Sequence, residues 1–367
     1  MTQLKLKVII SGGGTGGHIY PAIAVAQTLQ KRLNNQVEFL FVGASDRMEM
    51  EKVPKAGYAI EGLWISGLQR SLSAKNLLFP IKVISSVVKS LGIINRFRPD
   101  LAIGFGGYAS GAMMYAATLK GIPTMIHEQN SYAGITNKIL KNRVNKIGVA
   151  YDKMERFFPA NRIVKTGNPV RLDILQSGDK RDAAIHFFGL NPNRKTLLII
   201  GGSLGARTIN QSIEKDLELL NMAEINVIWQ TGKLFESQKA AKQDAGFCLK
   251  VAPFIYEMDL AYAAADIVIS RAGALSIAEL AIVGKPTILV PSPNVSEDHQ
   301  TKNALALVEK DAALFIKDID AKEELVPAVL DLLVDTVKQK QLSANIKALA
   351  ITDAAERIVD ELLALKK

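Results

Sequence analysis

Short apolar runs recur along the first half of the chain, and stretches with a helical spacing of apolar positions separate most of them. The runs occupy residues 7–10, 37–42, 59–64, 101–105, 123–127, 146–150 and 163–166. Runs this short and continuous are typical of parallel strands that are buried on both faces, with helices as the crossovers. The pattern predicts an α/β fold in which helices cover both faces of a parallel sheet.

The second half of the chain repeats this organisation. Its apolar runs occupy residues 196–200, 226–230, 248–251, 267–270, 286–290 and 313–316. A chain of 367 residues is long enough for two domains. A Gly-Asn-Pro turn at residues 167–169 marks the junction, and a final helical stretch at residues 342–365 is long enough to cross between the domains. We therefore expect an N-terminal domain of residues 1–165 plus about 350–367, and a C-terminal domain of residues 166–349.

A glycine-rich loop follows the first predicted strand. Residues 12–17 contain five glycines, so the backbone can adopt positive φ and lie flat against a ligand. The next residues predict a helix at 19–29 with Pro21 in its first turn, and the unpaired N–H groups at a helix start favour negative charge. His18 stands at the mouth of the loop, where a titratable imidazole is suited to acid–base chemistry.

Two more loops of the first half follow predicted strands. One is glycine-rich and spans residues 104–111, and the other is polar and spans residues 127–134. Because the carboxyl ends of parallel strands meet at one edge of a sheet, and ligands bind there, we expect these loops to converge with the first loop at 11–18.

The second half offers loops of the same kind. Residues 201–206 follow a strand and precede a helix, so the hydroxyl of Ser203 is suited to a phosphate at the helix start. A later strand also runs through a turn into a helix, on which the Glu279 carboxylate can accept hydrogen bonds from a ribose diol. The amides of Gln300 and Asn303 share one helix face and are suited to sugar hydroxyls.

Two enzyme classes compete with this interpretation on motif grounds. The glycines at 12–17 satisfy the G-x-G-x-x-G pattern of dinucleotide-binding dehydrogenases, but Gly43 and Ala44 stand where the second strand should end in an acidic residue. Residues 201–205 satisfy the G-x-S-x-G pattern of a hydrolase nucleophile elbow. A hydrolase, however, gives no role to the converging loops of the first domain.

The net charge of +9 is unevenly distributed. Residues 1–165 hold 22 Lys and Arg against 9 Asp and Glu, a balance of +13, whereas residues 166–367 hold 23 against 27, a balance of −4. A basic half facing an anionic partner is the simplest explanation. The chain shows no signal-peptide pattern and no run of 18 apolar residues, and its single cysteine excludes an intrachain disulfide. We expect the chain to be made and kept in the cytosol, with nucleic acid or an anionic membrane surface as the partner of its basic half.

The segment from residue 67 to residue 80 mixes apolar and basic residues, and a helix is predicted after it to about residue 95, with positions 81, 84, 88 and 91 on one face. As a membrane patch it would insert apolar side chains among headgroups and pair its cations with anionic lipid, at roughly 1 kcal/mol per cation. The patch residues are Arg70, Leu72, Lys75, Leu77, Leu78, Phe79 and Lys82, with Lys138, Lys141, Arg143 and Lys146 as an extension. The alternative is a surface helix with a solvated basic face. Few aromatic residues lie among these cations, which argues against nucleic acid as the partner.

Seven stretches in this order resemble the bacterial MurG family, which transfers N-acetylglucosamine from UDP-N-acetylglucosamine to the lipid-linked N-acetylmuramyl-pentapeptide, lipid I. They are GGGTGGH at 12–18, GFGGYASG at 104–111, HEQN at 127–130, GNPVR at 167–171, GGSLGA at 201–206, RAGALSIAEL at 271–280 and DHQTKNA at 298–304. The resemblance implies a GT-B fold, with two Rossmann-like domains and the active site in the cleft between them. It implies no metal and no cofactor. It also implies a peripheral protein at the cytoplasmic face of the plasma membrane.

The resemblance also implies roles for individual residues. The donor site would comprise Thr15, Gly16, Gly17, Asn130, Arg171, Ser203, Ile255, Ala274, Leu275, Ser276, Ile277, Ala278, Glu279, Gln300 and Asn303. The acceptor site would comprise Gly13, Gly14, Tyr108 and Ser110.

The implied reaction is a single inverting displacement by the 4-hydroxyl of the muramyl sugar, which releases UDP. His18 is the first candidate for the base, because its unperturbed pKa of about 6.5 lies close to working pH, and Glu128 is the second. Two alternatives stay open. One is another GT-B enzyme that acts on UDP-N-acetylglucosamine, either an epimerase or a lipid glycosyltransferase with a different acceptor. The other is a non-catalytic membrane or nucleic-acid adaptor.

Overall fold

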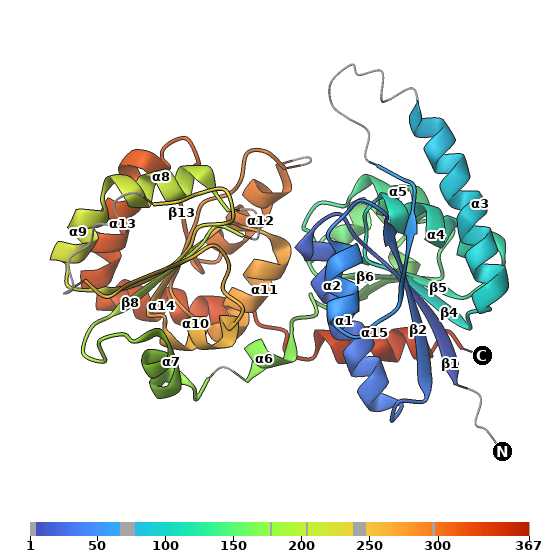
Figure 1. Cartoon of the computed structure of the whole chain (residues 1–367), viewed down its shortest axis with the longest axis horizontal. Coiled ribbons are helices and arrows are strands. Elements are labelled where there is room, and N and C mark those ends of the chain that lie inside the picture. The colour runs from blue at the N-terminus through green and yellow to red at the C-terminus, as the bar shows by residue number, and fades with distance from the viewer. Residues whose placement is uncertain are drawn as a thin grey trace. The chain divides into compact units, whose positions relative to one another are not determined.

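The computed structural model describes residues 5–66, 78–176, 178–202, 205–237, 247–295 and 298–366. The chain divides into two compact units (Figure 1). The N-terminal unit comprises Met1–Arg171 and Asp353–Lys367, and the C-terminal unit comprises Leu172–Thr352. The first boundary therefore falls a few residues after the predicted junction at 165, and the second falls just after the predicted return at about 350.

The N-terminal unit is built on a seven-stranded sheet in the order β3-β2-β1-β4-β5-β6-β7, and all of its strand pairs are parallel. The strands are β1 (Leu6–Ser11), β2 (Val37–Ala44), β3 (Ile60–Leu63), β4 (Leu101–Gly104), β5 (Thr124–Glu128), β6 (Lys146–Val149) and β7 (Ile163–Lys165). The chain reverses its direction of strand addition between β1 and β4. The loops after these two strands therefore flank a topological switch point, where open α/β sheets bind ligands.

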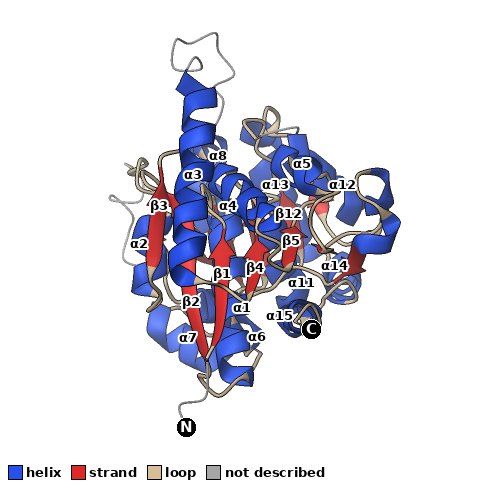
Figure 2. Ribbon diagram, turned by 90° about the vertical axis from the view of Figure 1, so that its right-hand side faces the viewer, coloured by secondary structure: helices blue, strands red, loops and turns tan. Residues whose placement is uncertain are grey.

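Helices cover both faces of this sheet (Figure 2). They are α1 (Gly16–Arg32), α2 (Glu49–Lys55), α3 (Phe79–Phe97), α4 (Tyr108–Leu119), α5 (Ile135–Leu140) and α15 (Ala354–Leu363), with 3-10 turns at Met154–Arg156 and Ala160–Arg162. Successive residues of β1 serve opposite faces: Val8 and Ile10 belong to the core under α1 and α15, whereas Ile9 belongs to the core under α3 and α4. Burial on both faces explains why the strands are continuous apolar runs.

The C-terminal unit has a six-stranded parallel sheet in the order β10-β9-β8-β11-β12-β13. Its strands are β8 (Thr196–Ile200), β9 (Asn226–Gln230), β10 (Leu249–Ala252), β11 (Ile267–Ser270), β12 (Thr287–Leu289) and β13 (Leu314–Phe315). Its helices are α6 (Leu172–Leu175), α7 (Arg181–Phe188), α8 (Arg207–Lys215), α9 (Leu217–Met222), α10 (Met258–Ala264), α11 (Ala274–Val283), α12 (His299–Val308), α13 (Ala321–Val334) and α14 (Thr336–Lys347). The switch point of this sheet lies between β8 and β11, and the loops that follow both strands carry predicted donor residues.

Every predicted strand has a counterpart in the described residues, and the bounds differ by only a few residues. The prediction for the first helix was less accurate. α1 begins at Gly16, after Thr15 in an extended conformation, so His18 lies in the first helical turn and Pro21 lies beyond that turn. The two glycines at the helix start obscured this in the sequence, because glycine is a poor helix former.

The prediction of one continuous helix at 342–365 was wrong. α14 ends at Lys347 and α15 begins at Ala354, and the residues between them include the β-branched Ile351 and Thr352, which disfavour helix. The break coincides with the boundary between the two units at Thr352.

Candidate functional site

The loop between β1 and α1 packs against the loop between β4 and α4. Gly14 has φ +87° and Gly107 has φ +89°, a region that favours glycine. A Cβ atom on Gly107 would lie 2.6 Å from the carbonyl oxygen of Gly13, so this close approach also requires glycine. The predicted convergence of these two loops is confirmed.

His18 is held in the space between these loops. Its Nδ1 lies 2.8 Å from the carbonyl oxygen of Gly13, and its ring is partly exposed. Since a carbonyl oxygen can only accept, Nδ1 carries the hydrogen and Nε2 keeps a lone pair in the neutral ring. Nε2 lies beside Gly106, where an added Cβ would be 3.1 Å away. The ring is therefore oriented as a general base requires, with one nitrogen anchored and the other able to take a proton.

Glu128, the second candidate base, is in a different position. It is 2% exposed, and both carboxylate oxygens accept hydrogen bonds from the loop that follows it and from α5. Oε1 accepts from the backbone and side-chain nitrogens of Asn130, at 3.1 and 3.3 Å. Oε2 accepts from the backbone of Gly134 and the amide of Asn137, both at 2.9 Å. This geometry fits a residue that shapes the loop and places Asn130.

His127 and Gln129 of the same motif are buried and polar. His127 Nε2 donates to the carbonyl of Gly167 at 2.9 Å, and its Nδ1 accepts from Gln129 at 3.2 Å. Burial lowers the pKa of His127 from 6.5 to about 4, against an opposing effect of the Gly167 hydrogen bond. His127 is therefore a neutral structural residue that joins the end of β5 to the turn after β7.

The predicted acceptor residues divide into surface and interior positions. Tyr108 is exposed, and its ring meets the ring of Phe79 edge-on at 6.1 Å. Gly14 is exposed, whereas Gly13 is buried beneath it. Ser110 is fully buried, and its Oγ packs against Gly104, where an added Cβ would be 2.5 Å away. Ser110 thus lies in the packing beneath α4 and does not reach the surface that Tyr108 offers.

In the C-terminal unit, the loop after β8 is described at both ends, while Ser203 lies outside the described residues. Gly202 and Gly205 both have positive φ, and an added Cβ on Gly205 would lie 2.3 Å from the carbonyl oxygen of Thr231. The amide of Gln230, at the end of β9, donates to the carbonyl of Gly202 at 3.2 Å and accepts from the backbone of Ile255 at 3.0 Å. Gln230 therefore connects two predicted donor segments. The sequence analysis missed it, although a glutamine at the end of an apolar strand was the available signal.

The run that follows β11 enters α11 after Gly273. Ala274 and Ile277 are buried, whereas the other predicted donor residues of this helix are partly exposed: Leu275, Ser276, Ala278 and Glu279. Glu279 Oε2 accepts from the hydroxyl of Tyr262 at 3.1 Å. This bond orients the carboxylate, and Tyr262 is a second supporting residue that the sequence analysis did not identify.

The two amides predicted to contact the sugar differ in burial. Asn303 is fully buried and donates to the carbonyl of Ala272 at 3.3 Å, so it supports the loop before α11. Gln300 is partly exposed, and its oxygen accepts from the backbone of Ser292 at 2.9 Å. This bond turns the amide nitrogen of Gln300 away from Ser292, so Gln300 is the better placed of the two to contact a ligand.

Arg171 is the last residue of the N-terminal unit. Its guanidinium lies 5.8 Å from the centre of the Tyr20 ring, on the first turns of α1. The same helix carries Thr15, Gly16 and Gly17 at its start. Arg171 thus adds positive charge beside a helix N-terminus, an arrangement suited to an anionic group.

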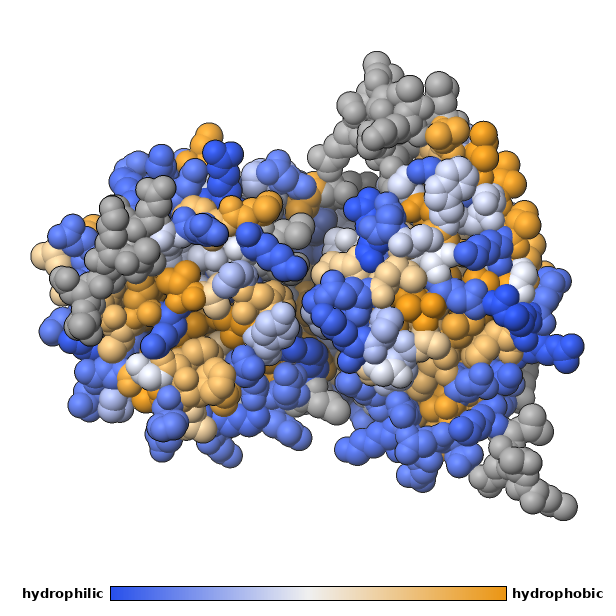
Figure 3. Space-filling model, viewed as in Figure 1, coloured by the Kyte–Doolittle hydropathy of each residue, from blue (hydrophilic) through white to orange (hydrophobic). Residues whose placement is uncertain are grey.

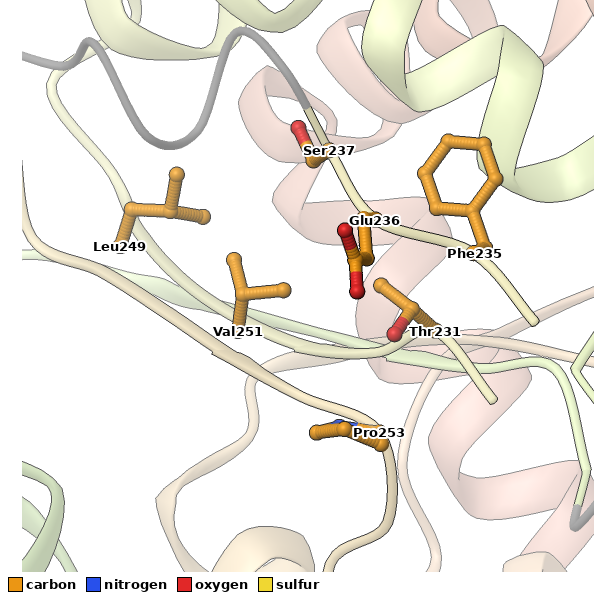
Figure 4. A pocket seen from close by; sticks show the side chains of 7 residues that line it. All are labelled: Thr231, Phe235, Glu236, Ser237, Leu249, Val251 and Pro253. Atoms are coloured by element: carbon orange, nitrogen blue, oxygen red, sulfur yellow. The ribbon is translucent and has the colours of Figure 1, made fainter. Parts of the chain in front are cut away.

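A cavity of about 370 Å³ lies beside the ends of β9 and β10 in the C-terminal unit (Figure 4). Its lining residues are Thr231, Phe235, Glu236, Ser237, Leu249, Val251 and Pro253. None of the predicted donor residues is among them. The cavity is thus not the predicted donor site.

The predicted membrane patch is described in part: Arg70, Leu72, Lys75 and Leu77 lie outside the described residues. Along α3, Ile81, Ile84 and Val88 are exposed, and Ile84 keeps 65% of its surface. The residues of α3 that are buried in the unit are Ser86, Ser90, Ile93 and Ile94, with partly buried valines beside them. Figure 3 shows apolar side chains gathered over α3.

Helix α5 adds to this surface, because α3 and α5 both pack against α4. Ile135 and Ile139 of α5 are exposed. Lys82 donates to Ser66 at 2.8 Å and lies 5.4 Å from the centre of the Trp64 ring. In the parts of the chain that the structure describes, no helix has the length and apolar content to cross a membrane.

Comparison with known proteins gives one consistent result. Residues 8–149 match the model of the glycosyltransferase family 28 N-terminal domain, and residues 196–358 match that of the family 28 C-terminal domain. The UDP-N-acetylglucosamine--N-acetylmuramyl-(pentapeptide) pyrophosphoryl-undecaprenol N-acetylglucosamine transferase of Cytophaga hutchinsonii is 57% identical over 359 residues, which cover 98% of this chain and 96% of the relative. The corresponding transferase of Flavobacterium psychrophilum is 54% identical, with 98% of each chain covered.

Solved structures agree with these relatives. The crystal structure of MurG from Acinetobacter baumannii has a TM-score of 0.77 and 28% identity, with 98% of this chain and 99% of that chain covered. The UDP-GlcNAc 2-epimerase of Neisseria meningitidis has a TM-score of 0.68 at 14% identity, with 98% of this chain and all of that chain covered. At that identity the epimerase shares the fold alone.

Proposed function

Since the chain belongs to the MurG family of glycosyltransferase family 28, we propose that it transfers N-acetylglucosamine from UDP-N-acetylglucosamine to lipid I, which forms lipid II and UDP. The observation that carries the proposal is the full-length similarity, at 57% identity, to a transferase named for this reaction. The geometry of His18 supports it independently, because a partly exposed imidazole with an anchored Nδ1 is what the displacement needs.

The proposed reaction is a single displacement. The 4-hydroxyl oxygen of the N-acetylmuramyl sugar attacks the anomeric carbon of the donor while its proton passes to His18 Nε2. A new glycosidic bond forms as the bond from the anomeric carbon to UDP breaks, so the configuration inverts. The departing diphosphate gains negative charge, which the N–H groups of the loop after β8 and the start of α8 would stabilise. Arg171 is the proposed cationic contact. One preorganised donor of this kind supplies on the order of 3 kcal/mol.

The two units would divide the substrates between them. We assign the acceptor and the membrane surface to the N-terminal unit, which carries the basic charge, and UDP-N-acetylglucosamine mainly to the C-terminal unit. Glu279 would bind the ribose, with its carboxylate oriented by Tyr262. Gln300 would contact the sugar. Tyr108 and Gly14 would face the acceptor.

A peripheral position on an anionic membrane is supported by the exposed apolar side chains of α3 and by the exposed isoleucines of α5. Lysines and arginines lie near them in the sequence. The lipid-linked acceptor makes this position useful, because the N-terminal unit would meet its substrate at the surface. We place the protein at the cytoplasmic face of the plasma membrane.

The test is transfer of label. Purified protein is incubated with radiolabelled UDP-N-acetylglucosamine and vesicles that contain lipid I, and the lipid fraction is counted. Label in the lipid fraction that depends on lipid I supports the proposal. Conversion of the sugar nucleotide to another isomer without lipid labelling would instead favour an epimerase. Labelling of vesicles that lack lipid I would indicate a different acceptor.

A further inference from the structure

Glu49, the first residue of α2, is a buried carboxylate that neither the predicted site nor the proposed reaction uses. It is fully buried. Its Oε1 accepts from the backbone of Ala44 at 2.9 Å, and its Oε2 accepts from the backbone of Gly14 at 3.0 Å. The carboxylate thus bonds the glycine-rich loop directly.

The surroundings of Glu49 fit its side chain closely. A Cβ on Gly13 would lie 2.0 Å from Glu49 Oε1, and a Cβ on Gly43 would lie 2.4 Å from its Cγ. No real Cβ comes this near to another heavy atom, so both positions require glycine if Glu49 is to stay in place. Two glycines therefore create the space that the carboxylate fills.

One peptide group joins Glu49 to His18. The N–H of Gly14 and the C=O of Gly13 belong to the same planar, trans peptide, so they point in opposite directions. Glu49 accepts from the N–H side at 3.0 Å, and His18 Nδ1 donates to the C=O side at 2.8 Å. A charged acceptor on the N–H polarises the peptide and makes its carbonyl a stronger acceptor.

We propose that Glu49 is a positioning residue that acts on His18 through the Gly13–Gly14 peptide: it fixes the orientation of that peptide, and thereby the ring and the Nδ1–H tautomer of His18. The arrangement does through one peptide what the carboxylate of a catalytic triad does by direct contact with its histidine. It also stabilises the imidazolium that forms when Nε2 takes a proton. The kinetic part of this proposal rests on the proposed function, in which His18 is the base.

The first test is a measurement on the unmodified protein. The chain has four histidines, so the imidazole ¹⁵N signals of a histidine-labelled sample can be assigned by replacing each in turn. We expect His18 as the Nδ1–H tautomer and His127, whose Nε2 donates to a carbonyl, as the opposite one. An Nε2–H signal for neutral His18 would overturn the proposal whatever the enzyme's activity.

The second test uses Glu49→Gln. The amide cannot accept from both backbone N–H groups, since its NH₂ group can only donate. We expect the His18 signals to shift toward a mixture of tautomers. We also expect kcat to fall about tenfold or more, with the 10²- to 10⁴-fold contribution of a general base as the upper limit. KM for UDP-N-acetylglucosamine should change less than about threefold, because the donor residues of the C-terminal unit are unaltered. If Glu49→Gln does not fold, Glu49→Asp keeps the charge and should give a smaller change in the same two readouts.

Asp100→Asn is the matched control. Asp100 also accepts from a backbone N–H, that of Lys7 at 2.8 Å, but at the amino end of β1, far along the strand from the loop. We expect it to alter stability without changing the His18 tautomer or kcat. If Glu49→Gln loses stability as Asp100→Asn does and leaves both the tautomer and kcat unchanged, Glu49 is merely structural. A tautomer shift in a protein that transfers no sugar would support the positioning role and refute only the proposed function.

Discussion

His18 and His127 show how burial and one hydrogen bond decide what a histidine can do. Each donates one ring N–H to a backbone carbonyl, but through opposite nitrogens. His127 is fully buried, and its second nitrogen accepts a hydrogen bond from Gln129, so neither ring nitrogen is open to solvent or to a substrate. His18 is partly exposed and leaves its second nitrogen for chemistry. The residue type is the same, so the difference between the proposed base and the structural histidine lies only in their surroundings.

Replacing His18 with Gln should lower kcat by about 10²- to 10⁴-fold, the usual contribution of a general base. Gln keeps a donor for the Gly13 carbonyl but cannot take a proton, so KM for the donor should stay within about threefold. Steady-state transfer assays measure both constants. His186→Gln, on the exposed surface of α7, is the control and should match the unmodified protein. Turnover within about threefold of normal in His18→Gln would show that another group is the base.

Because the pKa of His127 is lowered, we expect the folded protein to lose stability in mild acid. Its pKa is lowered from 6.5 to about 4 in the folded protein, so between these pH values the unfolded chain binds a proton that the folded chain does not. The contribution of neutral His127 to the free energy of unfolding is complete above about pH 6.5, falls as the pH drops, and is lost by about pH 4. It amounts to about 3 kcal/mol over this window.

The pH dependence of the free energy of unfolding is measured by urea unfolding at several pH values, with proteolysis as the readout of the unfolded fraction. His127→Gln should unfold with a shallower pH dependence between about pH 4 and 6.5, whereas His186→Gln should keep the slope of the unmodified protein. Equal slopes in His127→Gln and the unmodified protein would mean that burial of His127 is not the cause.

Helix α3 packs one face on the N-terminal unit and leaves a second apolar stripe exposed. Its buried residues include Ser86 and Ser90, whose hydroxyls donate to the carbonyls of Trp64 and Ser86. Ile93 and Ile94 are buried as well, whereas Ile81, Ile84 and Val88 are exposed. An exposed apolar stripe of this kind on a basic unit is typical of a membrane-binding helix.

The triple change Ile81→Ser, Ile84→Ser and Val88→Ser should release the protein from vesicles of phosphatidylglycerol and phosphatidylcholine in sedimentation assays. Burial of each apolar side chain contributes about 1.5–3 kcal/mol, so the partition coefficient should fall at least tenfold. Sugar transfer to soluble acceptor analogues, measured as the UDP released from the donor, should stay unchanged.

The control for this change is Val334→Ser with Val337→Ser, two valines of the C-terminal unit that are at least as exposed. Their replacement should leave vesicle binding intact. If the triple variant and the unmodified protein sediment equally with vesicles, α3 does not contribute to membrane binding.

Each unit has its own parallel sheet with helices on both faces. The N-terminal unit, however, also contains the last helix of the chain. Ile358, Val359 and Leu362 of α15 are fully buried in the core beneath β1 and α1. Arg32 of α1 pairs with Asp360, at 2.6 Å, and with Glu356. The last helix therefore belongs energetically to the first domain.

Replacing Leu362 with Ala should destabilise the N-terminal unit by about 2–5 kcal/mol, the usual cost of truncating a buried leucine. Limited proteolysis with mass spectrometry should then show cleavage within residues 5–171 before cleavage within residues 172–352. Val334→Ala, at an exposed position of α13, is the control and should leave the pattern unchanged. Simultaneous loss of both units in Leu362→Ala would show that they unfold as one.

The pattern of apolar runs determined the strands, their parallel pairing and the repeated strand–loop–helix organisation, because burial on both sheet faces leaves a direct mark on the sequence. The seven motifs determined the family, and the glycine loop determined where His18 would lie. Side-chain partners between distant segments left no such mark. Only the folded chain brings Glu49 to Gly14, Gln230 to Ile255 and Tyr262 to Glu279.

Burial also separated residues that the motifs had grouped together. In the motif at 104–111, Ser110 is buried and Tyr108 lies at the surface. In the motif at 298–304, Asn303 is buried and Gln300 lies at the surface. Neighbours along a helix can face opposite environments, and the environment is set by the elements that pack around the helix. The same reason explains α3, whose apolar stripe is visible in the sequence but whose exposure depends on how α4 meets its other face.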